Sequence, residues 1–529
     1  MSDTLPAVMP DVSRVRALAC PRQAKIVSGG HDLARTPASS WSSGKAGPRI
    51  KSGVTRMVTL LVASSLTACS MAPTYVRPET PVPPSWPVGD AYLRNSEAAL
   101  PAVRYQDIFR DPRLQALVSQ AIANNRDLRV AAANIAAARG QFKIQRAEIF
   151  PEVDANSGAT FRGGQGATGA KTSYNASVGI TAFELDLFGR IRSETDASLN
   201  RYFATEAAAR SVRLTMIGDI ADAWLDYASD KSLLKIAQDT AASAQKSVDL
   251  TKKRLDGGIA PRTDLRQAEL ILDTAKSDVA AQTTALAQDV NALQLLVGAP
   301  IDPANLPNSI DEAGATLAEL PAGLDSAILL RRPDVVEAEY QLRAANAEIG
   351  AARAALFPKI TLTGLVGFVS NALGALFAGG AFNWQAGGAA SYPIFRAGAG
   401  KANVEVSKAQ RDAAVATYEK TIQTAFREVA DALARRGTIT DQLGATRNLR
   451  DAAADNYKLS DMRYRGGIDS YLQSLDAQRS LYSAERTLIT TQLTRASNLV
   501  TLYRVLGGDS LVEATKAGPQ PLSTPEPTP

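Results

Sequence analysis

The sequence predicts a mainly α-helical protein with a small β part, in which a strand-strand-long-helix unit occurs twice. Three observations support this fold class. Short motifs recur at one offset along the 529 residues, long proline-free segments have helical periodicity, and two pairs of shorter segments alternate apolar with polar residues. Because the repeat is much longer than that of a short solenoid, it indicates a duplicated half of the protein.

Three landmarks recur in the same order, about 208 residues apart, and carry the prediction of a duplication. The matched stretches are 146–151 with 353–358, 254–259 with 463–468, and 296–298 with 505–507. Several matches at one offset are hard to obtain by chance. The chain is therefore expected to contain the same structural unit twice.

Two proline-free segments, from about residue 193 to 254 and from about 400 to 463, are each predicted to be one helix. Such a helix has roughly 60 residues and is on the order of 90 Å long. Apolar residues step by three and four along the helical segments, which is typical of a coiled-coil seam. The stripes are Leu214, Ile217, Ala221, Trp224 and Ala228 in the first copy, and Ala338, Leu342, Ala345, Ile349, Ala352 and Leu356 in the second.

The segments that follow each Phe-Pro pair, at about 151–183 and 359–392, have strand periodicity. Each contains two runs of about ten residues with one apolar and one polar face, the length that a tilted strand needs to cross a bilayer. Apolar series such as Tyr174, Ala176, Val178, Ile180 and Ala182 define one face. A soluble hairpin would show the same alternation. The duplication, together with the secretion signal and lipidation described next, favours strands in a membrane.

Residues 1–68 are predicted to contain a signal peptide. The residues before it are predicted to be an extension that results from a start codon assigned too far upstream. Basic residues precede the apolar run 57–66, which is too short to span a bilayer and ends at small residues. The following Leu-Thr-Ala-Cys run looks like a bacterial lipobox, which predicts that Cys69 becomes the lipid-carrying first residue of the mature chain. A small buried cysteine is the alternative.

The composition excludes most catalytic chemistry. The chain has 58 Lys and Arg, 53 Asp and Glu, one His and two Cys; without residues 1–68 the charges are 49 against 50, no His is left, and Cys69 is the only Cys. Cys/His metal sites and nucleophile-histidine pairs are therefore excluded, and no phosphate-binding glycine loop is present. We expect no enzyme, no metal, no cofactor other than the covalent lipid, and no nucleic-acid partner. An enzyme with paired carboxylates is the weaker alternative.

Four strands cannot close a membrane barrel by themselves. The smallest single-chain barrels have about eight strands, and open sheet edges are not tolerated in lipid. Several chains must therefore pool their hairpins. Very long helices joined to such hairpins in an exported chain imply a tube that extends from the outer membrane into the periplasm.

The chain resembles the TolC-like outer-membrane efflux factors, specifically the lipoprotein (NodT-type) branch that serves resistance-nodulation-division pumps. Four motifs across almost the whole mature chain carry the resemblance, and the third is the most specific. They are 69–78 after the lipobox, 109–112 with 125–128, the run from Arg331-Arg332-Pro333-Asp334-Val335 to Phe357-Pro358, and 463–467 leading to 475–478. The tryptophan pair often found before the second motif is missing.

The resemblance implies a homotrimer that forms a 12-stranded outer-membrane β-barrel continued by a 12-helix periplasmic α-barrel. The chain is then divided into six parts. These are the signal segment 1–68, a lipidated linker and equatorial segment 69–110, the first repeat 111–298, an inter-repeat linker 299–328, the second repeat 329–508, and a Pro-rich tail 509–529, in which residues from Lys516 to Pro529 are expected to lack regular structure.

The glycine pairs of the second landmark are predicted to form tight helix-to-helix turns, because glycine adopts positive φ at no steric cost. The resemblance implies that these turns are periplasmic tips that contact a membrane-fusion adaptor. The implied contact residues are Arg254, Gly257, Gly258, Arg463, Gly466 and Gly467. Turns without a further role are the alternative.

The same resemblance places a periplasmic gate just past the second tip, with Leu472 as an apolar ring and Asp476 as an acidic ring. An acidic ring at a narrow pore favours cations, and an apolar ring can close a pore by dewetting. The alternative for Asp476 is an acidic residue in the first turn of a helix, where the helix dipole favours negative charge.

The implied function is the outer-membrane channel of a tripartite multidrug or solute efflux system, a passive exit duct anchored by lipid. Its implied partners are an inner-membrane resistance-nodulation-division pump, a periplasmic adaptor and the lipid of the outer membrane. Two alternatives remain: the duct of a type I secretion system, and an envelope-spanning coiled-coil lipoprotein without a channel. No motif indicates the transported substrates.

Overall fold

The computed structural model describes residues 70–87, 92, 104–163, 171–319, 326–508, 512–515 and 518–521. The predicted lipid-carrying Cys69 lies outside these residues. The chain divides into two units, Met1–Leu66 and Thr67–Pro529, and every described residue belongs to the second.

The predicted duplication and mainly α-helical character are confirmed, because the helices occur in matched pairs. The pairs are α4 (Arg126–Ala147) with α8 (Pro333–Ala354), α5 (Arg190–Asp256) with α9 (Ala399–Arg465), and α6 (Arg262–Val297) with α10 (Tyr471–Val505). Helices α5 and α9 have 67 residues each, or about 100 Å at the rise of an α-helix. Both are slightly longer than the sequence predicts, since each extends beyond the expected segment at both ends.

Short helices connect these elements. They are α2 (Tyr105–Ile108), α3 (Pro112–Asn124), α7 (Ile310–Ala315), and the 3-10 helices η2 (Pro303–Asn305), η3 (Ser326–Arg331) and η4 (Leu373–Ala375). At the start of α3, the Asp111 side chain accepts a hydrogen bond from Arg113 N at 2.9 Å, and Pro112 occupies the first helical position. This is a typical N-terminal cap.

The main core lies where helices of both repeats meet α2, α3 and α7. The predicted stripe from Leu214 to Ala228 is buried along its whole length. Trp224 at its centre is fully buried, and its indole N–H donates to Asn305 O at 3.0 Å. The second stripe is buried or half-buried as far as Ala352, whereas the prediction fails at Leu356, which is exposed because α8 ends before it.

Strands β1 (Asp154–Arg162), β2 (Lys171–Glu184), β3 (Lys359–Ser370) and β4 (Phe382–Ser391) form one antiparallel sheet in that order. Strands β2 and β3 pair with each other, so the hairpins of the two repeats make one continuous sheet. Strands β1 and β4 are its two edges, and β4 is exposed along its entire length.

A β-bulge interrupts the predicted alternation in β2. The register against β3 shifts between Ile180 and Phe183, and Ala182 has a φ of 53°. Ile180 and Phe183 pair with Gly364 and Leu362, which lie on one face of β3. The prediction that Ala182 continues the face of Ile180 is therefore wrong, since Phe183 takes that place.

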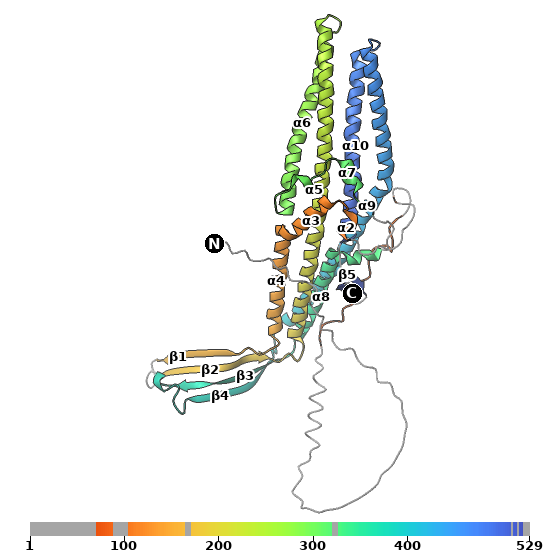
Figure 1. The fold of residues 1–529 in the computed structure, drawn as a ribbon. Coiled ribbons are helices and arrows are strands. Elements are labelled where there is room, and N and C mark those ends of the chain that lie inside the picture. The colour runs from red at the N-terminus through yellow and green to blue at the C-terminus, as the bar shows by residue number, and fades with distance from the viewer. Residues whose placement is uncertain are drawn as a thin grey trace, which may run out of the picture. The chain divides into compact units, whose positions relative to one another are not determined.

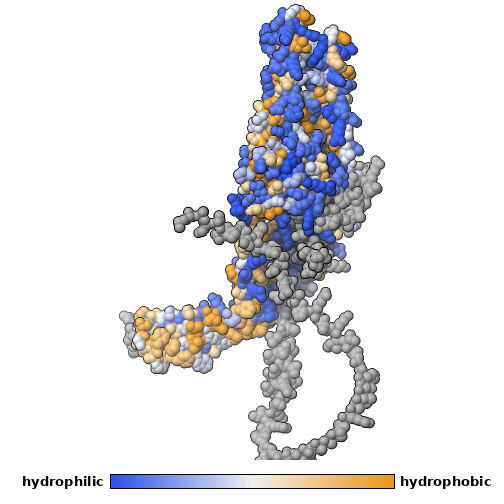
Figure 2. Space-filling model, in the orientation of Figure 1, coloured by the Kyte–Doolittle hydropathy of each residue, from blue (hydrophilic) through white to orange (hydrophobic). Residues whose placement is uncertain are grey.

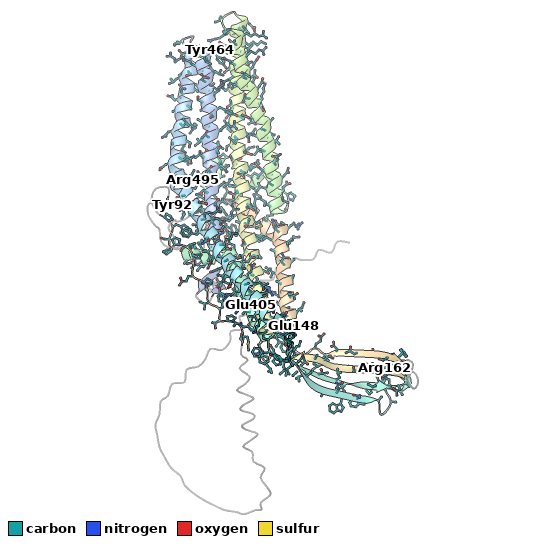
Figure 3. All side chains as sticks on the ribbon, turned by 180° about the vertical axis from the view of Figure 1, so that it is seen from behind. Tyr92, Glu148, Arg162, Glu405, Tyr464 and Arg495 are labelled. Carbon is teal, nitrogen blue, oxygen red and sulfur yellow. The ribbon has the colours of Figure 1, made fainter. Side chains whose placement is uncertain are left out.

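The strands lie at one end of the helical layer, and the turns that join α5 to α6 and α9 to α10 lie at the other (Figure 1). In Figure 3, Tyr464 marks the turn end and Arg162 the far end of the sheet, whereas Glu148 and Glu405 lie where helices and strands meet. On the face that Figure 2 shows, hydrophobic residues predominate over the strands and hydrophilic residues over the long helices. Within the described residues, no helix has both the length and the apolar character that a membrane span needs.

Part of the Pro-rich tail is ordered. Strands β5 (Val512–Thr515) and β6 (Gly518–Pro521) form a two-stranded antiparallel sheet, and the Tyr340 hydroxyl donates to Pro519 O at 3.2 Å. The prediction that the chain from Lys516 onward lacks regular structure is wrong for Gly518–Pro521, because backbone pairing with β5 and a contact with α8 hold these residues.

Candidate functional site

Each pair of long helices is joined by a glycine turn of the same geometry, and these two turns are called the tips below. In the first tip, Gly258 has a φ of 72° and Ile259 N–H donates to Arg254 O at 2.8 Å. In the second tip, Gly467 has the same φ and the equivalent bond. The bonds are those of a Schellman cap. Only the second glycine of each pair has the positive φ that the sequence predicts; the first has a φ that any residue adopts.

The two predicted contact arginines differ in their surroundings. Arg254 reaches across to the other tip, where its guanidinium lies 4.4 Å from the Tyr464 ring and donates to Tyr464 O at 3.4 Å. Arg463 is exposed and pairs with Asp469 of its own turn at 2.5 Å, which raises the pKa of Arg463 and lowers that of Asp469. Arg254 therefore joins the tips, and Arg463 leaves its outer surface open to a partner.

An apolar residue that the sequence analysis did not single out follows each glycine pair. Ile259 and Ile468 occupy equivalent positions in the two tips, and both are largely exposed. Both isoleucines could have been identified from the sequence, because they belong to the repeated Gly-Gly-Ile landmark. Both tips thus present an apolar side chain, and the second presents it beside the exposed Arg463.

The predicted gate residues lie on one exposed face near the start of α10. Leu472 is 51% exposed and Asp476, one turn further on, has 64% of its side chain exposed. The adjacent face packs Tyr471 and Leu475 against Tyr464 in a small core. Because α10 begins at Tyr471 and has no acidic residue in its first turn, the helix-dipole alternative for Asp476 loses its basis.

A polar contact connects the two helical hairpins and was missed by the sequence analysis. Tyr482 on α10 donates a 2.5 Å hydrogen bond to the Asp278 carboxylate on α6, and Arg486 lies 3.5 Å from the same carboxylate. Burial and the bond to Asp278 raise the pKa of Tyr482. We call these three residues the latch. The sequence indicates this contact only weakly, because Tyr482 fits the same apolar helical pattern as Tyr471 and differs from it only by its polar role.

The segment 70–87, called the strap below, lies along α8 in its first part and contacts α9 through Trp86. Met71 O accepts from Arg353 at 3.1 Å, and Pro73 O accepts from Asn346 at 2.8 Å. A Cβ on Gly350 would lie 2.7 Å from Ala72, so the close approach requires glycine at this position. The strap therefore runs from the strand end of α8, where its residue 70 follows Cys69 directly, towards the core.

A buried carboxylate fastens the strap. Glu339 on α8 is 1% exposed and accepts from Arg77 of the strap at 2.7 Å and from Arg343 of α8 at 2.9 Å. The Tyr75 hydroxyl also donates to Glu339, at 3.3 Å, and burial raises the pKa of Tyr75 to about 12. Two guanidinium groups offset the cost of burying this charge.

The run 331–335, which begins the most specific motif of the sequence, holds the start of α8 in place. The Arg332 guanidinium is buried and donates to Asp334 at 2.7 Å, to Glu428 of α9 at 2.8 Å and to Val505 O at the end of α10 at 2.9 Å. The motif therefore has a structural role, since it joins three helices of the second repeat.

Carboxylates form a row along α5 and are joined by one from α6. Burial, with contributions from neighbouring carboxylates, raises the pKa of Asp222 and of Asp289 to about 6 and raises that of Asp226 and Asp230. Arg504 lies 3.5 Å from Asp222 and lowers its pKa in part. Asp222 and Asp289 are therefore more protonated near pH 5 than near pH 7.

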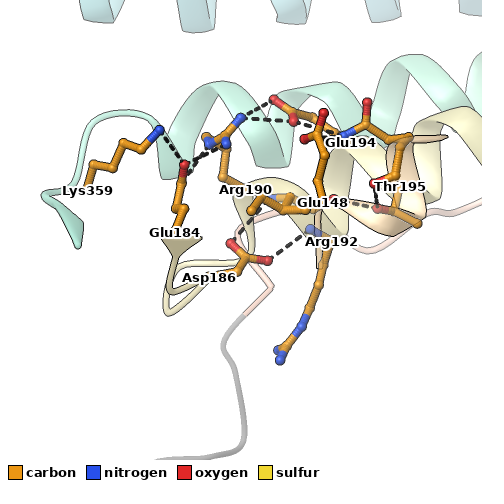
Figure 4. A network of polar contacts seen from close by, with 10 residues as sticks. Glu148, Glu184, Asp186, Arg190, Arg192, Glu194, Thr195 and Lys359 are labelled. Atoms are coloured by element: carbon orange, nitrogen blue, oxygen red, sulfur yellow. Dashed lines mark hydrogen bonds and ion pairs between the residues drawn. The ribbon is translucent and has the colours of Figure 1, made fainter. Parts of the chain in front are cut away.

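An ion-pair network lies where the sheet meets the helices (Figure 4). Glu184 at the end of β2 lies 2.7 Å from both Arg190 of α5 and Lys359 of β3. The Asp186 carboxylate accepts from Arg192 N at 2.9 Å and caps α5. Beside the network, the rings of Phe188 and Phe357 stack at a centroid distance of 4.7 Å. These contacts fix the second strand of the first repeat to the first strand of the second.

Comparison with known sequences gives long matches. A family model described as outer membrane efflux protein matches residues 117–299 and 324–508. The toluene efflux pump outer membrane protein TtgC of Pseudomonas putida is 44% identical over 468 residues, which cover 87% of this chain and 96% of TtgC. Outer membrane protein OprJ of Pseudomonas aeruginosa is 39% identical over 85% of this chain and 95% of OprJ.

Comparison with solved structures gives the same fold. The open state of the MtrE outer membrane channel of Neisseria gonorrhoeae matches with a TM-score of 0.75 and 36% identity, over 83% of this chain and 98% of MtrE. CusC, whose crystal structures describe transmembrane channel formation, matches with a TM-score of 0.76 and 35% identity, over 83% of this chain and all of the CusC chain.

Proposed function

Because the chain belongs to the outer membrane efflux protein family, we propose that it forms, as a homotrimer, the exit duct of a tripartite efflux system. The protein is an outer-membrane component of efflux, and its long helices extend from the membrane into the periplasm. It serves as a passive channel for solutes that an inner-membrane pump of the resistance-nodulation-division class and a periplasmic adaptor deliver.

The open sheet is the observation that carries the proposal. Four strands with two unpaired edges cannot stay in lipid, because each unpaired backbone group there costs several kcal/mol. Three copies that pair β1 with β4 of the next copy supply twelve strands and leave no edge. Strands of 9 to 14 residues suit a tilted membrane crossing.

The helices continue the duct. In each chain the seams bury one face of the long helices, and the exposed faces of α9 and α10 are largely polar. Two helical hairpins from each of three chains give a tube of twelve helices below the barrel. A polar lining suits water and dissolved solutes. The alternative, a coiled-coil spacer without a channel, would not need a membrane-spanning sheet.

Conductance and mass together test the proposal. Full-length protein purified in detergent is expected to have the mass of three chains and to form discrete conducting channels in planar bilayers. Deletion of the gene is expected to sensitise cells to a panel of antibiotics and aromatic solvents, chosen because the relatives are named for toluene and antibiotic efflux. A monomer, or bilayers that stay impermeable, would overturn the proposal. Loss of an exported protein without any drug sensitivity would instead support a secretion duct.

The tips are proposed to meet the adaptor, and Arg463 tests this contact. Arg463→Glu is expected to abolish most of the resistance while the trimer content stays unchanged. Since the substitution also places a second carboxylate beside Asp469, the double variant Arg463→Glu/Asp469→Arg restores the pair within the turn. Resistance is expected to stay low in the double variant. Recovery would mean that the turn itself, and not an adaptor, needs the pair.

Leu472 and Asp476 are proposed to line the periplasmic constriction, where threefold symmetry repeats each side chain. Asp476→Ala is expected to raise single-channel conductance or to weaken cation selectivity, because three negative charges leave a narrow pore. Asp451→Asn, an exposed acid on α9, is the control and is expected to leave both unchanged. Traces of the Asp476 variant that match the wild type would remove this assignment.

Cys69 is proposed to carry the lipid that anchors each strap to the inner leaflet of the outer membrane. The barrel also holds the protein, so Cys69→Ser is expected to reduce correct trimer assembly more than membrane association. Sucrose-gradient fractionation and native gels measure the two separately. A soluble variant would show that the lipid is the principal anchor.

A further inference from the structure

The β-hairpins of the two repeats contact each other between β2 and β3. The chain contains the segments that form this contact twice, once in each repeat. Phe188 lies four residues after the end of β2, and Phe357 lies two residues before the start of β3. Their rings stack with an interplanar angle of 19°. This aromatic pair marks the line where the first repeat meets the second.

The duplication supplies an equivalent of each ring. Phe395 lies four residues after the end of β4, as Phe188 does after β2. Phe150 belongs to the Phe-Pro landmark that recurs at Phe357. Phe395 is 87% exposed and Phe150 is 63% exposed. Both rings are thus presented to solvent in the single chain, whereas their equivalents stack on each other.

Strand order determines which copy can cover these rings. Antiparallel pairing of β2 with β3 sets the end of one strand beside the start of the other, as Glu184 opposite Thr361 shows. The same pairing of β4 with β1 of a second copy sets the segment after β4 beside the segment before β1. We propose that Phe395 of each protomer stacks on Phe150 of the next, which closes the trimer at the level where barrel and helices join.

The backbone supports the same arrangement. Leu185 N–H, just after β2, donates to Ile360 O at 2.8 Å. The equivalents are Tyr392 after β4 and Val153 before β1, and both side chains are exposed. The proposed contact therefore includes a hydrogen bond from Tyr392 N–H to Val153 O of the next protomer. This bond adds one more backbone pair to the pairing of β4 with β1.

The polar half of the junction is not repeated. The ion pair of Lys359 with Glu184 has Glu152 and Ser391 as its equivalents, and these two side chains cannot form an ion pair. The exposed Ile394, equivalent to Leu187, adds apolar surface instead. The contact between copies is therefore apolar, and burial of aromatic rings is its main source of free energy.

Paired cysteines test this contact, which rests on the proposed homotrimer. Phe150→Cys/Phe395→Cys in the full-length protein in outer membranes is expected to give cross-linked dimers and trimers on denaturing gels after mild oxidation or a short bismaleimide. The single variants, which retain Cys69, are expected to stay monomeric on the gel. Phe188→Cys/Phe357→Cys is the positive control for the geometry and is expected to react within one chain without a change in mass.

Phe188→Cys/Phe395→Cys is the spacing control, because one strand always lies between β2 and β4: β3 within a chain, and β1 across the proposed contact. Cross-linking of Phe150→Cys/Phe395→Cys well above this control supports the contact. A trimer by native mass that fails to cross-link, while the intrachain control reacts, overturns the contact and leaves the proposed function intact. Equal yields in the spacing control also overturn it. A monomer by native mass overturns both proposals.

Discussion

Glu339→Ala is expected to destabilise the protein by about 3–5 kcal/mol, the cost of removing one partner from a buried ion pair. The substitution leaves Arg77 and Arg343 near a cavity without the carboxylate that both contact at less than 3 Å. Both side chains are largely buried, so water replaces the lost partner poorly. We expect a lower midpoint of thermal unfolding in detergent and faster proteolysis of the strap.

Two variants on α8 control this experiment. Glu337→Ala removes a half-buried acid of the same helix that contacts only Gln341 by hydrogen bond among the residues described, and it is expected to have a small effect. Glu339→Gln keeps the shape but not the charge, and its effect is expected to be intermediate. Wild-type stability together with wild-type protease resistance of residues 70–87 in Glu339→Ala would contradict the role given to this carboxylate.

In the proposed trimeric channel, Asp278→Ala is expected to raise the resting conductance strongly. The substitution removes the acceptor of both Tyr482 and Arg486, the latch between α6 and α10. A hydrogen bond to a charged group contributes about 1.5–3 kcal/mol, and the proposed trimer contains three latches. Even partial loss of that energy shifts the balance between closed and open tips by orders of magnitude.

Planar-bilayer recordings of purified trimers measure this effect. Tyr482→Phe removes one hydroxyl with little change in shape, and it is expected to raise the resting conductance by a smaller factor. Asp273→Ala, an exposed acid of the same helix, is the matched control and is expected to behave as the wild type. If the Asp278 and Asp273 variants conduct alike, the contact between α6 and α10 does not hold the tips together.

The sequence predicts the elements of this fold well because their periodicity is local. The stripe centred on Trp224 and the glycine turns follow from spacings of a few residues, and both are observed. The predicted ends of α5 and α9 differ from the observed ends by only a few residues. Duplication strengthens each such prediction, since the same pattern occurs twice.

The contacts between residues far apart in the sequence were not predictable in the same way. Glu339 sits in an Ala-rich helical pattern where an acid usually faces solvent, and its partner Arg77 is 262 residues away in the chain. The bond from Tyr482 to Asp278 spans 204 residues. The bulge at Ala182 was missed because a residue other than glycine adopts a positive φ there. Each of these features depends on neighbours that only the folded chain brings together.

Helices α5 and α9 contain the same number of residues, 67. One residue removed from only one of them would lower its glycine turn by about 1.5 Å and rotate it by about a quarter of a revolution. In the proposed trimer, the turns would then lie at two alternating heights, and an adaptor that contacts them would meet an uneven surface. We therefore expect a change in the length of one of these helices to need an equal change in the other.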